Sequence, residues 1–262
     1  MKIVLYGSCQ VTAIAQLLRL NLDINLDINF EVIKNWVYIL NKNPLPPSMF
    51  ICDIFIYQPY NGHIDHKDYH TDTILQMLND NVKIISIPFM CSYIHWPDYY
   101  IDSRNLRTDD LPFGKFPQQS SVLSKYTTLT DMLSDYNTTH YTSEFLENRT
   151  NMIFDVIAKV ELSCDVKILD FIKQHTNEQL FYSAQHPSNK LLIHVTKQIL
   201  DIMNIQISII HTSPELLKDH TVFILPCIQR YFNLHVDQYK LNGNGIVDEK
   251  QYLLKYFANI NT

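Results

Sequence analysis

The chain has 262 residues, of which 46% are hydrophobic, so it is long enough to bury one large core. Its 21 lysine and arginine residues against 27 aspartate and glutamate residues give a net charge of −6, which argues against nucleic acid as the main partner. Five cysteines without a C-x-x-C pair, no signal-peptide start and no apolar stretch of about 18 residues favour a cytoplasmic protein without a membrane span.

Strands and helices alternate in the first part of the chain. Buried strands are predicted from their apolar runs at residues 2–6, 30–33, 49–57 and 82–87, and helices from their apolar periodicity at residues 10–20 and 71–78. This alternation predicts an α/β fold with a central parallel sheet covered by helices.

The pattern changes after Pro88. An aromatic and polar segment at 93–100 leads into helical patterns at 121–133 and 143–174, which we expect to form a lid. A short extended piece at 181–182 is interrupted by His186-Pro187, and Ser188 is predicted to cap a helix over 189–203. A glycine-containing turn at 242–245 and an amphipathic helix at 249–260 follow. We expect one domain over residues 1–262, with 206–262 as a C-terminal helical extension.

The first strand ends in the turn Gly7-Ser8-Cys9-Gln10. A tight turn from a parallel strand into a helix leaves backbone N–H groups aimed at an anion or oxyanion. Gly7 would let the chain turn sharply, and the helix N-terminus would stabilise the Cys9 thiolate, which makes Cys9 a candidate nucleophile. The alternative is that Cys9 packs as a small hydrophobic residue, as most free cysteines do.

A second candidate, His186, lies in a loop held by Pro187 and by the start of the next helix. An imidazole in that setting can act as a general base. The alternative is a structural histidine.

The turn resembles a motif of a known family: Gly7-Ser8-Cys9-Gln10 is similar to the Gly-Asn-Cys-Gln signature of the WcbI polysaccharide-biosynthesis family. Three further segments are similar to the family's motifs in the same order: a strand at 53–58 that ends in Gln58, a Pro, aromatic and Pro-Asp segment at 87–98, and the run Gln185-His186-Pro187-Ser188-Asn189. The resemblance covers about the first 205 residues.

The resemblance implies an SGNH-hydrolase-like three-layer fold, with Cys9 where those enzymes have the serine nucleophile and His186 where they have the base. It also implies a coenzyme-A-binding acetyltransferase that acts on sugars. The sequence departs from the pattern at Ser8, which replaces an asparagine, and at Ser183, which stands where an SGNH hydrolase carries the aspartate that orients the histidine. A backbone carbonyl or Asp98 could orient His186 instead.

Acyl transfer needs a base and hydrogen-bond donors for the oxyanion. The donor candidates are the N–H groups of Cys9 or Gln10 and the side-chain amide of Gln58, which could equally be a satisfied surface amide. Either Cys9 takes the acetyl group and passes it on, or His186 deprotonates an acceptor that attacks the thioester directly. The covalent route is slightly favoured, because exchange between thioesters is nearly balanced in energy.

Coenzyme A needs basic and aromatic partners, and an adenine ring could stack on Trp96. The candidates are Gly7, Ser8, Lys34, His95, Trp96, Arg107 and Asn189. The alternative for the 93–100 segment is that its aromatic side chains pack against the core.

His63, His66 and His70 have a spacing that could hold a metal, but their context beside Asn61-Gly62 indicates a solvated turn, so no metal is expected. No Walker loop and no G-x-G-x-x-G motif supports nucleotide hydrolysis or dinucleotide redox chemistry.

The leading hypothesis is an acetyltransferase that moves an acetyl group from acetyl-CoA to a sugar, with a nucleotide-linked amino sugar as one possible acceptor. The alternatives are an SGNH-like sugar esterase or deacetylase, and a non-catalytic module that binds coenzyme A or a sugar. The acceptor, N- or O-acetylation, acylation of Cys9 and the oligomeric state stay open.

Overall fold

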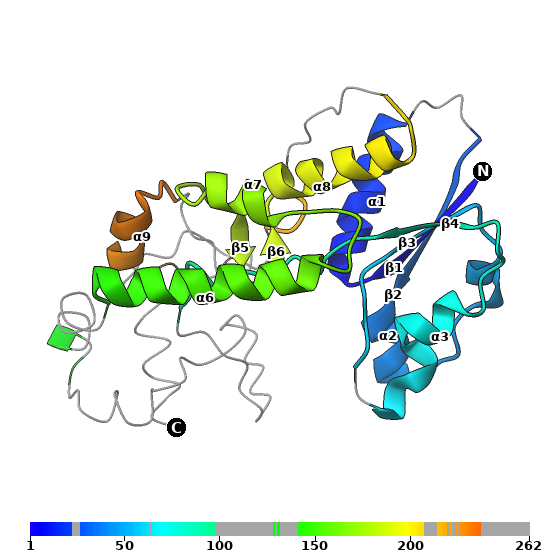
Figure 1. The fold of residues 1–262 in the computed structure, drawn as a ribbon, viewed down its shortest axis with the longest axis horizontal. Coiled ribbons are helices and arrows are strands. Elements are labelled where there is room, and N and C mark those ends of the chain that lie inside the picture. Colours follow the sequence, from blue (N-terminus) through cyan, green and yellow to red (C-terminus); the bar gives the residue numbers. More distant parts are fainter. Residues whose placement is uncertain are drawn as a thin grey trace. The chain divides into compact units, whose positions relative to one another are not determined.

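The structure is a computed structural model in which the described residues are 1–22, 27–62, 64–97, 128, 130–131, 141–206, 214–218, 221, 224 and 226–236. The chain divides into two compact units. The sheet unit comprises residues 1–90, 157–171 and 189–217, and the hairpin unit comprises residues 91–156, 172–188 and 218–262. Figure 1 shows the elements of both.

The sheet unit is built on four parallel strands in the order β2-β1-β3-β4. These strands are β1 (Lys2–Gly7), β2 (Asn29–Lys34), β3 (Ile54–Tyr57) and β4 (Lys83–Ser86). The central strand β1 reads as an unbroken apolar run because both of its faces are buried. The predicted α/β fold with a central parallel sheet is confirmed.

Helices cover both faces of this sheet. Helix α1 (Cys9–Asn21) packs beside α8 (Asn189–Ile202) on one face, whereas α2 (Asn35–Asn41) and α3 (Thr71–Leu75) lie on the other (Figure 1). The core under α2 and α3 consists of side chains from three strands and their connections: Val4, Tyr6, Ile33, Met49, Phe55, Ile74 and Val82.

The predicted strand at 49–57 is wrong in its first half. Pro46 and Pro47 begin a short 3-10 helix, Pro47–Phe50, and only Ile54–Tyr57 pairs in the sheet. Proline fixes φ and lacks an N–H donor, so this stretch turns before it can join the ladder. The predicted helix at 71–78 also ends early, at Leu75.

The hairpin unit holds β5 (Phe181–Ser183) paired antiparallel with β6 (His186–Pro187), and α9 (Pro226–Phe232). His186-Pro187 therefore does not interrupt an extended piece, as predicted, but forms the second strand of a hairpin. The predicted helical stretch at 143–174 is divided into α6 (Ser143–Glu161) and α7 (Leu169–Gln174), each of which crosses a boundary between the units. Of the predicted helix at 121–133 only residues 128, 130 and 131 are described, and the predicted elements at 242–245 and 249–260 lie outside the described residues. None of the described helices is long and apolar enough to cross a membrane.

The start of α8 corrects the predicted cap. The Ser188 hydroxyl is buried and has no hydrogen-bond partner among the described residues. The N–H of Asn189 donates instead to the carboxylate of Glu215 at 2.6 Å. A carboxylate at a helix N-terminus accepts from an otherwise unsatisfied donor and opposes the helix dipole, which explains why it replaces the serine.

Candidate active site

The turn that follows β1 lies at the point where the sheet changes winding direction. The connection from β1 to β2 runs through α1 on one face, and the connection from β2 to β3 runs through α2 on the other. In open parallel sheets of this order, ligands bind outside the carboxyl ends of the strands at this switch point. Cys9 follows β1 and Gln58 follows β3, so the fold brings both to the expected place.

Gln58 holds this turn through both ends of its amide. Its Oε1 accepts from the N–H of Ser8 at 2.9 Å and from the Ser8 hydroxyl at 2.8 Å. Its Nε2 donates to Oε1 of Gln10 at 2.7 Å and to the carbonyl of Pro88 at 3.4 Å. The side chain is 3% exposed, so Gln58 is neither a surface amide nor an uncommitted oxyanion donor. The geometry gives it a positioning role.

Gln10 extends the same network in the opposite direction. Its Nε2 donates to the carbonyl of Met90 at 2.7 Å, and its Oε1 accepts the Met90 N–H at 3.0 Å. With 0% exposure, the side chain holds structure, and only the backbone N–H of Gln10 is a candidate oxyanion donor. The backbone of Pro88 and of Met90 was not predicted as a partner of these amides, although the Pro88 segment was one of the family-like motifs.

Gly7 is required by the close approach of Gln58. A Cβ at this position would lie 2.6 Å from Oε1 of Gln58 and 2.8 Å from Cγ1 of Val11. These separations are shorter than van der Waals contact, so any larger residue would displace the amide that fixes the turn. The sequence predicted a sharp turn as the reason for Gly7, and the structure adds close packing against Gln58 and Val11 as a second reason.

Ser8 is the N-cap of α1. Its backbone is extended, and its hydroxyl accepts from the N–H of Gln10 at 3.3 Å while donating to Gln58. The cap fixes the first turn of a 13-residue helix whose positive end lies at Cys9.

Cys9 is half-buried, and its environment pulls its pKa in two directions. Burial raises the pKa of the thiol above its ordinary value. The backbone N–H groups of Cys9 and Gln10, the charge of Lys34 and the Ser8 hydroxyl all lower it, but by less. The expected activation by the helix N-terminus is therefore present but outweighed by burial, and at neutral pH the thiol keeps its proton until a base removes it.

Lys34 ends β2 directly opposite Gly7 in the parallel register. Its side chain is exposed, and it has neither an ion pair nor a hydrogen bond to any residue that the structure describes. It is placed to attract an anion to the turn, as predicted for a coenzyme A contact.

His186 lies in the hairpin unit, half-buried and opposite Ser183 in the β5–β6 ladder. Ser183, which stands where an aspartate was expected, is thus the cross-strand neighbour of the histidine. Asp98, the other candidate orienting group, lies outside the described residues. Cys9 belongs to the sheet unit, so its pairing with His186 stays a prediction.

His95 and Trp96 are 1% and 2% exposed. Their rings make an edge-to-face contact, and His95 makes another with Phe232. Burial lowers the pKa of His95 to about 4, so the imidazole is neutral at pH 7. These findings favour packing over ligand contact: His95 offers no charge to a phosphate, and Trp96 offers no open face to adenine.

Two further cofactor candidates were Asn189 and Arg107. The Asn189 amide donates to the carbonyl of Pro214 at 3.3 Å and accepts from the N–H of Leu216 at 3.0 Å, so it anchors the 214–216 segment to α8. This use argues against the predicted ligand contact. Arg107 lies outside the described residues.

The metal candidates can be followed only in part, because His63 is outside the described residues. His66 lies with its Nδ1 3.3 Å from the Tyr60 hydroxyl. The described part of the chain contains no group of three or more His, Cys, Asp or Glu side chains that could hold a metal ion.

Comparison with known proteins identifies a related family. The family model for the polysaccharide biosynthesis enzyme WcbI matches residues 2–207. A solved structure of WcbI, described as a novel polysaccharide biosynthesis enzyme in its native form without a disulfide bond between coenzyme A and one of its cysteines, is similar in fold. That similarity has a TM-score of 0.78 at 16% identity and covers 98% of this chain and 88% of that one. No curated protein matches the sequence.

Proposed function

Because the chain belongs to the WcbI family of polysaccharide biosynthesis enzymes and so has a role in glycan biosynthesis, we propose that it is an acetyltransferase. The proposed donor is acetyl-CoA, and the proposed acceptor is a hydroxyl or amine of a sugar. A nucleotide-linked amino sugar is the first acceptor class to test.

The observation that carries this proposal is the surroundings of the Cys9 sulfur. Two backbone N–H groups and the charge of Lys34 act on it, in a turn locked by Gln58 and Gln10. Such a turn suits a ligand that combines a thioester with phosphates, because the N–H groups can bind an oxyanion and the lysine an anion. The description of the similar WcbI structure, which mentions coenzyme A together with a cysteine, supports the same ligand.

The reaction needs a base, because the Cys9 thiol keeps its proton at neutral pH. In the covalent route, His186 takes that proton, the sulfur attacks the thioester carbonyl, the carbon–sulfur bond to coenzyme A breaks, and His186 passes the proton to the departing CoA sulfur. The sugar then attacks the acetyl-cysteine and loses its proton to His186, the carbon–sulfur bond to Cys9 breaks, and that proton returns to the Cys9 sulfur. In the direct route, His186 deprotonates the sugar group, which attacks the thioester itself, and His186 passes that proton to the CoA sulfur as its bond to the acetyl carbon breaks. The N–H groups of Cys9 and Gln10 are the proposed oxyanion donors in both.

The finer details of the fold belong to the same proposal. An SGNH-hydrolase-like arrangement would place the nucleophile after β1, where Cys9 lies, with helices of the later chain as a lid. Acetyl-CoA and nucleotide sugars are metabolites of the cytoplasm, which is the location that we propose.

The test combines binding with transfer. Calorimetry should show that the purified protein binds coenzyme A, and a radiolabel assay should show acetyl transfer to a sugar panel. His186→Ala should lower transfer by about 10²-fold or more in either route, and Cys9→Ala should do so in the covalent route. An acetyl group found on Cys9 by peptide mass spectrometry, and lost in Cys9→Ala, would select the covalent route.

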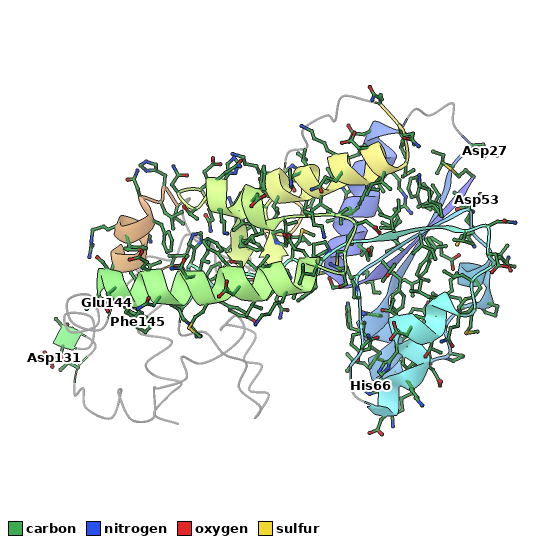
Figure 2. All side chains as sticks on the ribbon, viewed as in Figure 1. Asp27, Asp53, His66, Asp131, Glu144 and Phe145 are labelled. Atoms are coloured by element: carbon green, nitrogen blue, oxygen red, sulfur yellow. The ribbon has the colours of Figure 1, made fainter. Side chains whose placement is uncertain are left out.

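Cys52→Ala is the matched control. Cys52 is also half-buried, and burial also raises the pKa of its thiol, but it precedes β3 at the amino ends of the strands, next to Asp53, which Figure 2 labels. Transfer should be unchanged in this variant. Release of acetate from acetylated sugars without coenzyme A would support the esterase instead, and tight binding without turnover would support a non-catalytic module. A protein that neither binds coenzyme A nor transfers acetyl would refute the proposal.

A further inference from the structure

The two tryptophans of the chain have opposite surroundings. Trp96, the stacking candidate from the sequence, is 2% exposed, whereas Trp36 is 48% exposed. Trp36 is the second residue of α2, and α2 begins directly after Lys34 at the end of β2. A large aromatic ring left half in water is an available surface for a flat ligand.

The side chain of Lys34 is also available to a ligand. Lys2, at the other end of the same strand pair, forms an ion pair with Glu31 at 2.7 Å and donates a hydrogen bond to a backbone carbonyl. Lys34 has no such partner among the residues described, yet its charge reaches the Cys9 sulfur, whose pKa it lowers. The register of Lys34 opposite Gly7 explains that reach, because neighbouring strands lie about 4.8 Å apart.

The three groups follow a definite order. Cys9 follows β1, Lys34 ends the neighbouring strand β2, and Trp36 lies at the start of the helix that continues from β2. Coenzyme A has the same order of chemistry: a sulfur end, a phosphate-rich middle and an adenine end.

We propose that Lys34 and Trp36 form the nucleotide subsite for coenzyme A, with the ammonium beside the phosphates and the indole stacked on the adenine. The inference rests on the proposed function, since it concerns the same ligand. It differs from the prediction from sequence by replacing the buried Trp96 with Trp36.

Fluorescence can test the stack directly. In a Trp96→Phe protein, Trp36 is the single tryptophan, and coenzyme A should quench its emission, whereas pantetheine, which lacks the nucleotide, should not. If Trp96→Phe fails to fold, the wild-type protein and Trp36→Ala give the same information, because the quenching should be lost in Trp36→Ala.

Calorimetry supplies the affinities. Trp36→Ala should weaken coenzyme A binding by about tenfold or more, since stacking of a base on an aromatic side chain has an effect of this size. Its affinity for pantetheine should not change. Lys34→Gln should weaken coenzyme A binding by a few fold, and this effect should shrink as salt is added. Leu40→Ala is the control, because Leu40 is 65% exposed one turn further along α2.

The outcomes separate this inference from the proposed function. If the wild-type protein does not bind coenzyme A, the proposed function fails, and this subsite fails with it. If it binds, but Trp36→Ala binds equally tightly and Trp36 emission does not respond, the subsite is wrong and the proposed function stands. A Trp36→Ala protein that changes its oligomeric state in size-exclusion chromatography but keeps its affinity would likewise overturn the subsite, and would make Trp36 a contact between chains.

Discussion

The turn after β1 and the hairpin of β5 and β6 carry the two residues predicted to react. The two regions differ in how completely their buried polar groups are hydrogen-bonded. At the turn, the amides of Gln10 and Gln58 are bonded at both ends to Ser8, to each other and to the Pro88–Met90 backbone. In the hairpin unit, four buried polar atoms have no hydrogen-bond partner within the described ranges: Ser92 Oγ, His95 Nδ1, Gln179 Nε2 and Ser188 Oγ. In the sheet unit, the one such atom is Thr12 Oγ1, one turn into α1.

This difference indicates that the geometry is fixed at the turn after β1 rather than in the hairpin unit. A site that stabilises developing charge needs donors that are already in place, and a closed amide network provides them. Buried groups without partners lower stability instead, and they make the unit that contains them more sensitive to pH and to substitution. The predictions below test this contrast, beginning with the largest expected effect.

Gln58→Leu should destabilise the protein by about 3–5 kcal/mol. The substitution removes the partner of the Ser8 N–H and of Gln10 Oε1 while the surroundings stay buried, and each group left unsatisfied costs about 1–3 kcal/mol. Chemical denaturation measures the change. Gln16→Leu, an exposed glutamine on α1, is the control and should be nearly neutral. Equal effects of the two variants would mean that the amide network does not hold the turn.

Lowering the pH from 6.5 to 4 should reduce the free energy of unfolding by about 3 kcal/mol, because His95 is protonated less readily in the folded chain. The folded pKa of about 4 lies below the ordinary 6.5, so the unfolded chain binds a proton at a pH where the folded chain does not. Stability is then lost progressively as the pH falls from 6.5 to 4. The free energy of unfolding, followed over this window, should fall more steeply in the wild type than in His95→Gln. Parallel curves would show that His95 is not the group that titrates.

Glu215→Gln should destabilise the protein by about 1–2 kcal/mol, because it replaces a charge-assisted bond to the N-terminus of α8 by a neutral one. Ser188→Ala, at the predicted but unused cap position, should change the unfolding free energy by less than about 0.5 kcal/mol, or even stabilise. Thermal unfolding of the pair measures both. A larger effect for Ser188→Ala would restore the serine as the cap.

Lys34→Gln should slow alkylation of Cys9 by iodoacetamide at pH 8 by about two- to threefold, because removing the positive charge raises the pKa of the thiol further. Lys2→Gln is the matched variant, since Lys2 lowers the pKa of Cys52 in the same way. Peptide mass spectrometry separates the two cysteines, and each lysine should affect only its own thiol. An equal effect of both variants on Cys9 would indicate general charge rather than the position of Lys34.

Local patterns in the sequence predicted the elements that bury a regular apolar face. The buried run of β1 and the helical spacing in α1 and α8 were sufficient to place all three. Helix α2 was missed, because residues 36–40 form an unbroken apolar run without helical periodicity. The strand at 49–57 was predicted too long because its apolar residues outweighed Pro46 and Pro47 in the interpretation.

The position of the site was predictable from the sequence, but the roles of its individual residues were not. A strand, a tight turn and a helix start already indicated an anion-binding turn at Cys9. Whether Gln58 faces a substrate or holds Ser8 depends on partners brought together by the sheet. Glu215 takes the capping role from Ser188 by accepting from Asn189, 26 residues away in the chain. The pKa of Cys9 was misjudged for a related reason, because burial is a property of the folded surroundings and outweighs the local helix N-terminus.

The amide network also sets the order in which the molecule can acquire its site. Ser8 and Gln58 are 50 residues apart, and Gln10 and Met90 are 80 apart, so each hydrogen bond closes a long loop. The entropy lost on closing these loops must be offset by the pairing of the strands. During synthesis Cys9 leaves the ribosome before Met90, but the contacts that define its turn exist only after residue 90 has followed. Until then it is an ordinary thiol on an unfolded chain, and its chemistry appears together with the completed sheet.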